Sequence, residues 1–310
     1  MEQSLHVPST HSNPTGEAWR IPDPVSPAAR LGRRVLRSEL PQPLEPVRSA
    51  AKKLAWTAVE ARAVRSPFRY AFRELVRPTV AEYQLRGGDG RVVLRHRSGD
   101  IEIFHKFYAY GLYDWPANVI TALKGLGRPV NVVDLGANIG FFDVHTSEEL
   151  EVGRVVAVEP DPGNAAVLER VRNANRANWE IIRACASNRP HVVTFRSGFH
   201  NLSRVDADGD ISIPAVDVFP LVAEADLVKM NIEGAEWDVL QDPRLADTSC
   251  VWIVEYHTIA NPEIRITELA QRLFEQAGYA THVTMNHDQN GLLWAWKADP
   301  TDRAPAANRV

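Results

Sequence analysis

A strand that leads directly into a glycine-rich turn constrains the fold of this chain more than any other feature. The valine-rich run 130–135 is followed by Gly136-Ala137-Asn138-Ile139-Gly140, and a helix is expected to begin at Phe141. Glycines at such a turn let the backbone bend tightly and let a ligand approach more closely than a Cβ would permit. The pattern is typical of the first strand–turn–helix unit of an α/β sheet.

Strands and helices alternate along most of the remaining chain. Strands are expected at 155–158, 179–184, 191–195, 227–230 and 250–255, helices at 118–124, 141–150, 164–177 and 264–277, and a terminal hairpin at 280–285 and 291–296. Repeated strand–helix units favour a parallel sheet covered by helices on both faces, and the hairpin adds an antiparallel edge. The sequence therefore predicts an α/β fold over residues 117–298, followed by a flexible tail, 299–310.

The N-terminal part of the chain differs in composition and in its pattern of apolar residues. Eight prolines among polar residues predict a disordered tail over 1–46, because proline fixes φ and removes a backbone donor. Residues 47–80 read as a basic amphipathic helical extension that Pro67 splits and Pro78 ends. We expect its apolar stripe, which includes Leu54, Phe68 and Phe72, to pack on the domain. A contact with a partner or a membrane surface is the alternative for this basic helix, 47–77.

A lead-in segment, 81–116, connects this extension to the α/β domain. Turn residues at 87–90 and 98–100 predict a small β unit over 83–107. Aromatic residues then gather at Phe104, Phe107, Tyr108, Tyr110, Tyr113 and Trp115. They would form either core or one wall of a substrate pocket.

Composition excludes several classes of protein. A net charge of −4 over 310 residues disfavours a basic nucleic-acid binder, and no apolar run is long enough to span a membrane. Two cysteines supply neither a disulfide framework nor a four-thiolate metal site, and the N-terminus lacks the plan of a secretory signal. We therefore expect a soluble cytoplasmic protein.

The residues around the glycine turn point to a nucleoside ligand. The turn departs from the G-x-G-x-x-G of dinucleotide sites, and Asp134 before it disfavours a phosphate but suits a cationic or amino-acid group. Glu159-Pro160 ends the next strand about 20 residues later, where a carboxylate accepts hydrogen bonds from ribose hydroxyls. The combination favours a nucleoside that carries an amino-acid tail over a nicotinamide dinucleotide.

Two further motifs end later strands of the predicted sheet. Lys229-Met230-Asn231-Ile232-Glu233-Gly234-Ala235-Glu236 follows one strand, and Glu255 and His257 end the next. The carboxyl ends of parallel strands meet at one edge of a sheet, so we expect these side chains to converge. They offer three candidate general bases, His257, Glu233 and Glu236, of which His257 has the most suitable unperturbed pKa. Each has a purely structural alternative.

With these motifs in order and at these spacings, residues 98–297 resemble the FkbM family of S-adenosylmethionine-dependent methyltransferases. The resemblance implies a Rossmann-like class I methyltransferase fold with a mostly parallel seven-stranded sheet, and O-methylation of a natural product or sugar. It implies that Gly136, Ala137, Asn138 and Gly140 line the methionine part of the cofactor, with Asp134 nearby. It also implies that Glu159 and Pro160 lie at the ribose and that Cys185 and Ala186 lie beside the adenine.

One position departs from the family pattern. Asn231 stands where the family usually has aspartate, and a neutral amide does not take up a proton near neutral pH. Asn231 therefore orients the acceptor, or the base lies elsewhere. A divalent cation held by Asn231, Glu233, Glu236 and His257 is a less favoured alternative. A non-catalytic, partner-binding scaffold and a nicotinamide-dependent oxidoreductase are the alternative classes.

Overall fold

The computed structural model describes residues 45–198, 204–206, 208–259, 265–287 and 290–297. The tail predicted for 299–310 lies outside these residues, as does the tail predicted for 1–46 up to residue 44. Glu45 and Pro46 belong instead to the first described helix.

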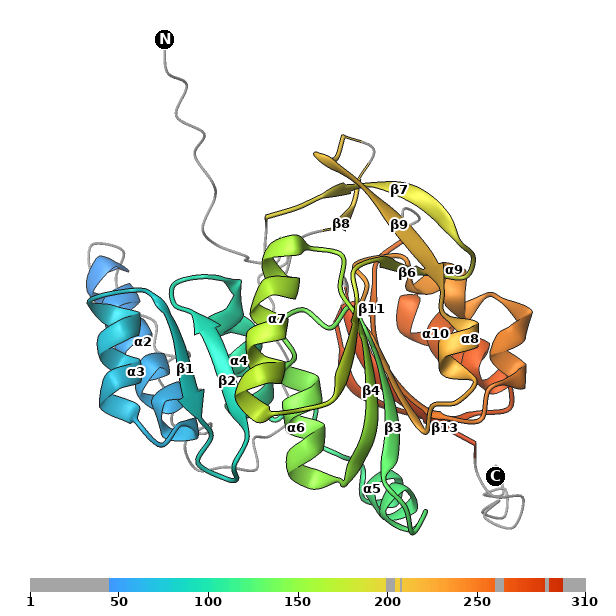
Figure 1. The fold of residues 1–310 in the computed structure, drawn as a ribbon, viewed down its shortest axis with the longest axis horizontal. Coiled ribbons are helices and arrows are strands. Elements are labelled where there is room, and N and C mark those ends of the chain that lie inside the picture. Colours follow the sequence, from blue (N-terminus) through green and yellow to red (C-terminus); the bar gives the residue numbers. More distant parts are fainter. Residues whose placement is uncertain (1–44, 199–203, 207, 260–264, 288–289, 298–310) are drawn as a thin grey trace, which may run out of the picture.

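A seven-stranded sheet forms the centre of the molecule (Figure 1). Its strands, in spatial order, are β12 (Ala280–Asn286), β13 (Asn290–Trp296), β11 (Val251–His257), β10 (Leu227–Met230), β3 (Val130–Leu135), β4 (Val152–Val158) and β5 (Trp179–Ile182). The five strands from β11 to β5 pair in parallel, and β13 lies antiparallel between β11 and β12. The predicted α/β fold with a mostly parallel sheet and a C-terminal hairpin is confirmed.

Alternate residues of each central strand enter different cores. Val132 and Val155 pack in one cluster with Phe142, whereas Val133 and Val156 pack in the other. Such strands are buried on both faces, which is why they read as nearly continuous apolar runs. The covering helices are α5 (Ala117–Lys124), α6 (Phe141–Glu149), α7 (Pro162–Asn175), α8 (Phe219–Val222), α9 (Glu236–Leu240), the short η4 (Pro243–Asp247) and α10 (Ile266–Gln276). In Figure 1, α6 and α7 lie on the opposite side of the sheet from α8, α9 and α10.

A second, four-stranded sheet follows β5, and the sequence predicted only one of its strands. The order is β6 (Cys185–Ser187), β9 (Ile211–Asp217), β7 (His191–Arg196) and β8 (Arg204–Val205). Three of these strands were missed because β6 and β8 are too short to show a pattern and β9 contains Pro214, which demotes a strand signal.

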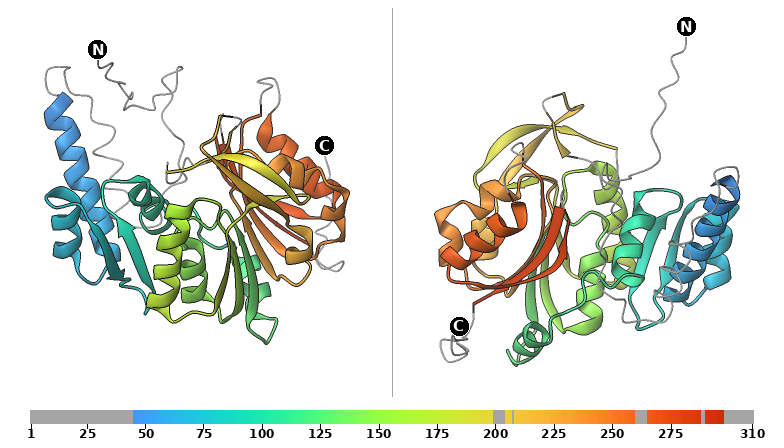
Figure 2. Two further views of the ribbon diagram at one scale, coloured as in Figure 1. Left: turned by 45° about the horizontal axis from the view of Figure 1, so that its top comes forward. Right: turned by 180° about the vertical axis from the view of Figure 1, so that it is seen from behind.

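The N-terminal unit lies at the end of the molecule opposite the C-terminal hairpin (Figure 2). It comprises α2 (Glu45–Glu60), η2 (Ala61–Ala63), α3 (Pro67–Leu75), β1 (Val80–Gln84), β2 (Arg91–Arg95) and α4 (Gly99–Tyr108). Pro67 splits the extension as predicted, because it occupies the first turn of α3, where no intrahelical donor is needed. None of the described helices is long and apolar enough to cross a membrane.

Two expectations about this unit are wrong. Residues 98–100 are not a β turn, because the Ser98 side chain accepts a hydrogen bond from the Asp100 amide and caps helix α4. The apolar stripe does not pack on the domain along its whole length, because Ala61 and Val64 are buried in the core but Leu54, Phe68 and Phe72 are 55%, 90% and 50% exposed. The buried face of α3 is instead made of Tyr70 and Glu74, whose polar groups are satisfied by partners inside the protein.

Candidate active site

The glycine turn after β3 lies directly against the turn after β10. Gly136 has a φ of +78°, and a Cβ added there would lie 1.9 Å from the carbonyl oxygen of Asn231. Asn138 and Gly140 also adopt positive φ, of +51° and +83°. The contact brings the two longest sequence motifs to one edge of the sheet, and only glycine fits at position 136.

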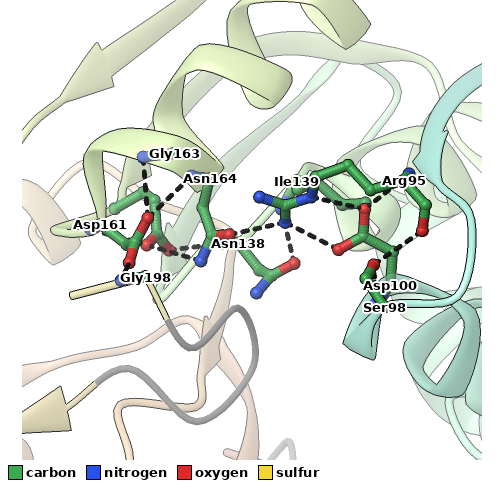
Figure 3. Close-up of polar contacts among 10 residues, drawn as sticks. Arg95, Ser98, Asp100, Asn138, Ile139, Asp161, Gly163, Asn164 and Gly198 are labelled. Carbon is green, nitrogen blue, oxygen red and sulfur yellow. Dashed lines mark hydrogen bonds and ion pairs between the residues drawn. The ribbon is translucent and has the colours of Figure 1, made fainter. Parts of the chain in front are cut away.

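Glu159 anchors the other side of this turn. Its side chain is buried and accepts hydrogen bonds from the backbone amides of Asn138 (2.7 Å) and Asp161 (2.9 Å) and from Asn164 Nδ2 (3.3 Å). Burial raises the pKa of Glu159 to about 7, although these donors favour the carboxylate. Figure 3 shows that Asn164 also contacts Arg95, which is paired with Asp100, so the N-terminal unit is connected to Glu159.

This pKa predicts a pH-dependent affinity for a nucleoside ligand. Ribose hydroxyls donate to a carboxylate, so protonation of Glu159 removes an acceptor. We expect the affinity for S-adenosylhomocysteine, measured by calorimetry, to fall about tenfold from about pH 8 to about pH 6, since a group with a pKa of about 7 is then mostly protonated. An affinity that stays constant over this range would contradict the assignment of Glu159 to the ribose.

Asp134 is fully buried and paired with a lysine. Lys229 Nζ lies 3.0 Å from Asp134 Oδ1 and donates to the carbonyl oxygen of Gly136 at 2.6 Å. Asp143 is buried close by, and burial raises its pKa well above the usual range, to which the charge of Asp134 adds. Lys229 therefore pairs with Asp134 and holds the glycine turn in place.

The segment after β5 places Cys185 and Ala186 in the second sheet. Both residues are buried, and neighbouring Ala184 and Ala186 pack in the core. Burial raises the pKa of the Cys185 thiol to about 12, with a further contribution from the charge of Glu159. A thiol with this pKa is a poor nucleophile near neutral pH.

The motif residues after β10 and β11 converge with two residues from the lead-in segment. We refer to Lys106, Tyr113, Asn231, Glu233, Glu236, Glu255 and His257 as the acid–base cluster. At its centre, the Glu255 carboxylate accepts hydrogen bonds from Tyr113 Oη (2.8 Å), Lys106 Nζ (3.1 Å) and Asn231 Nδ2 (3.0 Å). Burial opposes the charge of Glu255, but Lys106, His257 and Tyr113 hold the pKa of its carboxyl below the usual value. Glu255 is therefore a stable carboxylate that positions its neighbours.

His257 lies between two carboxylates. Its Nδ1 is 3.0 Å from Glu236 Oε1, and its Nε2 is 3.7 Å from Glu233 Oε2. Burial disfavours the imidazolium, but the hydrogen bond and charge of Glu236, with Glu233 and Glu255, raise the pKa of His257 to about 9. At neutral pH the ring is consequently protonated and is not available as a base.

Glu233 and Glu236 have different surroundings. Glu236 is buried and also accepts hydrogen bonds from the amides of Ile232 (2.9 Å) and Gly234 (2.8 Å), so it orders the turn after β10. Glu233 sits in that turn at a φ of +55°, with 28% of its side chain exposed. Burial raises the pKa of Glu233 to about 6, against the opposing charge of His257. This value is close to neutral pH, where a general base works best.

A metal site was the less favoured interpretation of these residues. In the part of the chain that the structure describes, no three histidine, cysteine, aspartate or glutamate side chains are grouped so that they would hold a metal ion. The acid–base cluster is held together instead by hydrogen bonds and ion pairs within the protein.

The family comparison covers this same region. The model of the methyltransferase FkbM domain matches residues 134–281, from the end of β3 into β12, and so includes the glycine turn, Glu159 and the motifs after β10 and β11. The chain contains an FkbM methyltransferase domain. The predicted resemblance to this family of S-adenosylmethionine-dependent methyltransferases is thus confirmed over residues 134–281.

Solved structures similar to this chain are methyltransferases with low sequence identity. Methyltransferase FkbM from Methylobacillus flagellatus KT is 14% identical, with a TM-score of 0.41, over 80% of this chain and 60% of that chain. A precorrin-6y C5,15-methyltransferase from Geobacter metallireducens GS-15 is 15% identical, with a TM-score of 0.37, over 59% of this chain and 87% of that chain. An S-adenosylmethionine-dependent methyltransferase from Agrobacterium tumefaciens is 10% identical, with a TM-score of 0.39, over 70% of each chain. No curated protein matches the sequence.

In the FkbM domain, the asparagine at position 231 has a defined electrostatic role. Because its amide donates to Glu255 Oε2 at 3.0 Å, an aspartate there would place two carboxylates in contact. We expect Asn231→Asp to destabilise the protein by about 1–3 kcal/mol at neutral pH, and less under acidic conditions where one carboxyl is protonated. Thermal unfolding over a pH series checks this, with Asn178→Asp, at an exposed position outside the site, as the control. Equal destabilisation at acidic and neutral pH would contradict it.

Sequence reasoning missed several residues of the FkbM site. Lys106 and Tyr113 contact Glu255 across more than 140 positions of sequence, and Asp143, Asn164 and Arg95 support the cofactor side. Tyr113 was noted only as one member of an aromatic group. No local pattern marks such residues, because their roles depend on partners that the fold supplies.

Proposed function

We propose that this methyltransferase transfers the methyl group of S-adenosylmethionine to a hydroxyl of a natural product or sugar. The observation that carries the proposal is the contact between the glycine turn after β3 and the turn that bears Glu233. This contact puts the predicted cofactor residues beside a carboxylate whose pKa is about 6. Gly136, Ala137, Asn138 and Gly140 would hold the methionine portion, Glu159 and Pro160 the ribose, and Cys185 and Ala186 the adenine.

The residues of the acid–base cluster fit the proton chemistry of O-methylation. The bound sulfonium supplies an activated methyl group and a good leaving group, so positioning accounts for much of the acceleration. As the new oxygen–carbon bond forms and the carbon–sulfur bond breaks, the hydroxyl proton passes to the Glu233 carboxylate. The His257 imidazolium is paired with Glu236, orients Glu233 and stabilises its negative charge. Glu255 positions Asn231, Tyr113 and Lys106 through hydrogen bonds.

Calorimetric titration with S-adenosylhomocysteine, followed by an assay with methyl-labelled S-adenosylmethionine and a panel of hydroxylated compounds, tests the proposal. We expect micromolar binding and label in an ether bond of the product. Binding without transfer to any oxygen, or transfer to carbon or nitrogen only, would overturn O-methylation. A folded protein that does not bind S-adenosylhomocysteine would overturn the assigned cofactor site.

A further inference from the structure

A cavity of about 450 Å³ is formed by α2, α3 and α4, outside the proposed cofactor site. One wall is the face of α2 that carries Lys53, Trp56, Thr57 and Glu60, which recur at helical spacing. The volume lies within the range of about 300–1,000 Å³ that is typical of small-molecule sites. This polar and aromatic face explains why α2 does not turn its apolar stripe toward the protein.

Lys106 connects this cavity to the acid–base cluster. The residue lines the cavity, and its ammonium group reaches Glu255 Oε1 at 3.1 Å. The charge of Glu255 raises the pKa of Lys106 above its usual value, so the ion pair persists at neutral pH. Of the acid–base cluster, Lys106 is the residue that also lines the cavity, so a molecule bound there would reach the cluster through Lys106.

The lining of the cavity carries balanced charge. Lys53, Arg97 and Lys106 face Glu60, Glu74 and Glu102, three cations against three carboxylates. Several of these are already satisfied within the protein: Glu60 accepts from Tyr70 Oη at 3.0 Å and pairs with His105 Nδ1 at 2.7 Å. A lining of this kind gives no net attraction for a phosphate or for a cation.

The cavity also has an aromatic wall. The Trp56 ring lies 4.2 Å from the His105 ring and 5.6 Å from the Tyr110 ring, centroid to centroid, and the indole is half-buried. Aromatic side chains provide a large contact area, while carboxylates and ammonium groups around them satisfy hydroxyls. This combination suits a neutral ring that has apolar C–H faces and a hydroxylated edge.

We propose that this cavity binds the methyl acceptor and that the acceptor is a neutral polyhydroxylated molecule of the sugar class. The proposal rests on the proposed O-methyl transfer, since it names the substrate of that reaction. It assigns the N-terminal unit, which lies outside the matched residues 134–281, the task of recognising the acceptor. Trp56 is then a specificity-determining residue.

A glycan array that displays neutral, uronic-acid and phosphorylated sugars tests this proposal with the full-length protein. We expect binding to neutral sugars, weakened about tenfold or more in Trp56→Ala because the aromatic contact is lost, and less so in Trp56→Phe. Leu54→Ala, which changes an exposed side chain of the same helix, should bind as wild type does.

Three results would contradict the proposal that this cavity binds the acceptor. The first is that the protein binds no neutral sugar on the array, the second is that it prefers the phosphorylated or uronic-acid sugars, and the third is that Trp56→Ala binds as wild type does. Calorimetry with S-adenosylhomocysteine on the same proteins separates this proposal from the proposed function. A protein that binds S-adenosylhomocysteine but no neutral sugar refutes only the acceptor cavity, and Trp56→Ala should keep its wild-type affinity for S-adenosylhomocysteine.

An independent observation concerns the outer surface of α3. Phe68, Phe72 and Val76 follow one another at intervals of four residues and are 90%, 50% and 65% exposed, so no described residue covers them well. Residues four apart lie on one ridge of a helix. An exposed apolar ridge that includes two phenylalanines marks an interaction site more often than an isolated exposed residue does.

A second ridge, of arginines, flanks the first. Arg69 and Arg73 lie in α3, each one position after a phenylalanine of the apolar ridge, and Arg77 follows the end of the helix. The Arg69 guanidinium also lies over the Tyr83 ring at 5.6 Å, and Arg73 donates a hydrogen bond to Thr79 Oγ1. Glu74, the acidic residue of α3, is turned inward, where it pairs with His96 Nδ1 at 3.1 Å. The outer face of α3 is consequently both aromatic and cationic.

We propose that this face of α3 docks on a membrane surface that contains anionic lipids. Phenylalanines inserted at the headgroup boundary and arginines paired with lipid phosphates and carboxylates are the two contributions that hold interfacial helices on membranes. Co-sedimentation of the full-length protein with vesicles of phosphatidylcholine, with and without phosphatidylserine, tests this. We expect binding to the phosphatidylserine vesicles only, and release at high salt because the charges are then screened.

Matched variants decide whether α3 is responsible. The double variant Phe68→Ser/Phe72→Ser should lose vesicle binding, whereas Val192→Ser, which changes a 71% exposed residue of β7, should keep it. No binding by wild type, or full binding by the double variant, would overturn the proposal. Light scattering that shows a dimer dissociated by the double variant would also overturn it, in favour of a second copy of the chain covering this face.

Discussion

Replacement of Glu233 by glutamine is expected to slow methyl transfer about 10²–10⁴-fold, the usual contribution of a general base. Glutamine keeps the length of the side chain, but its amide does not take up the hydroxyl proton. Glu233 is partly exposed and is not among the fully buried groups, so the variant should fold normally. The turnover number with labelled S-adenosylmethionine measures the effect. The affinity for S-adenosylhomocysteine should stay within about twofold of wild type, since that ligand presents no proton to Glu233.

The pH profile distinguishes loss of a base from loss of structure. In the wild type the rate should rise through about pH 6, where Glu233 loses its proton, and fall above about pH 9, where His257 loses its own. The glutamine variant should lack the acidic limb. Asp238→Asn is the control, because it removes an exposed carboxylate in helix α9, which begins directly after the turn that bears Glu233. This variant should behave as wild type. A Glu233→Gln enzyme with normal turnover would eliminate Glu233 as the base.

Replacement of Glu159 by alanine is expected to weaken binding of S-adenosylhomocysteine about 10²–10⁴-fold. The buried carboxylate would accept two ribose hydroxyls, and each hydrogen bond to a charged group contributes about 1.5–3 kcal/mol. Alanine also removes the acceptor that fixes the Asn138 amide at 2.7 Å, so the glycine turn loses its anchor. Calorimetric titration of both proteins at about pH 8, where the carboxylate is ionised in wild type, measures the difference.

Two further variants make the Glu159 result interpretable. Glu159→Gln preserves the shape and one acceptor oxygen, so an intermediate affinity is expected. Glu180→Gln, which removes an exposed carboxylate on β5, should bind as wild type does. Thermal unfolding of each variant shows whether the fold persists. A Glu159→Ala protein that is folded and binds with wild-type affinity would remove Glu159 from the cofactor site.

The succession of central strands along the chain and the position of the glycine turn could be predicted because their signals are local. Val132 to Leu135 is buried on both faces and therefore reads as an apolar run, and Gly136 is required by a close backbone contact and a positive φ. Glu159 follows at the spacing that one intervening helix and strand impose. By contrast, the four-stranded second sheet escaped notice, since strands of two or three residues are too short to show a period.

The chemistry of the acid–base cluster depended on contacts between distant segments. The sequence indicated His257 as the best base from its ordinary pKa, but Glu236 and Glu233 surround the ring and raise that pKa to about 9. It could not assign Asn231, whose role follows from its bond to Glu255, nor include Lys106 and Tyr113, which approach from the lead-in segment. The sequence by itself therefore determined the fold class of the central sheet and the segments that carry the candidate site, because burial and turn geometry are encoded over a few neighbouring residues. Only the tertiary structure decided which groups are charged and which side of α2 and α3 faces inward, because both depend on the partners that the fold brings together.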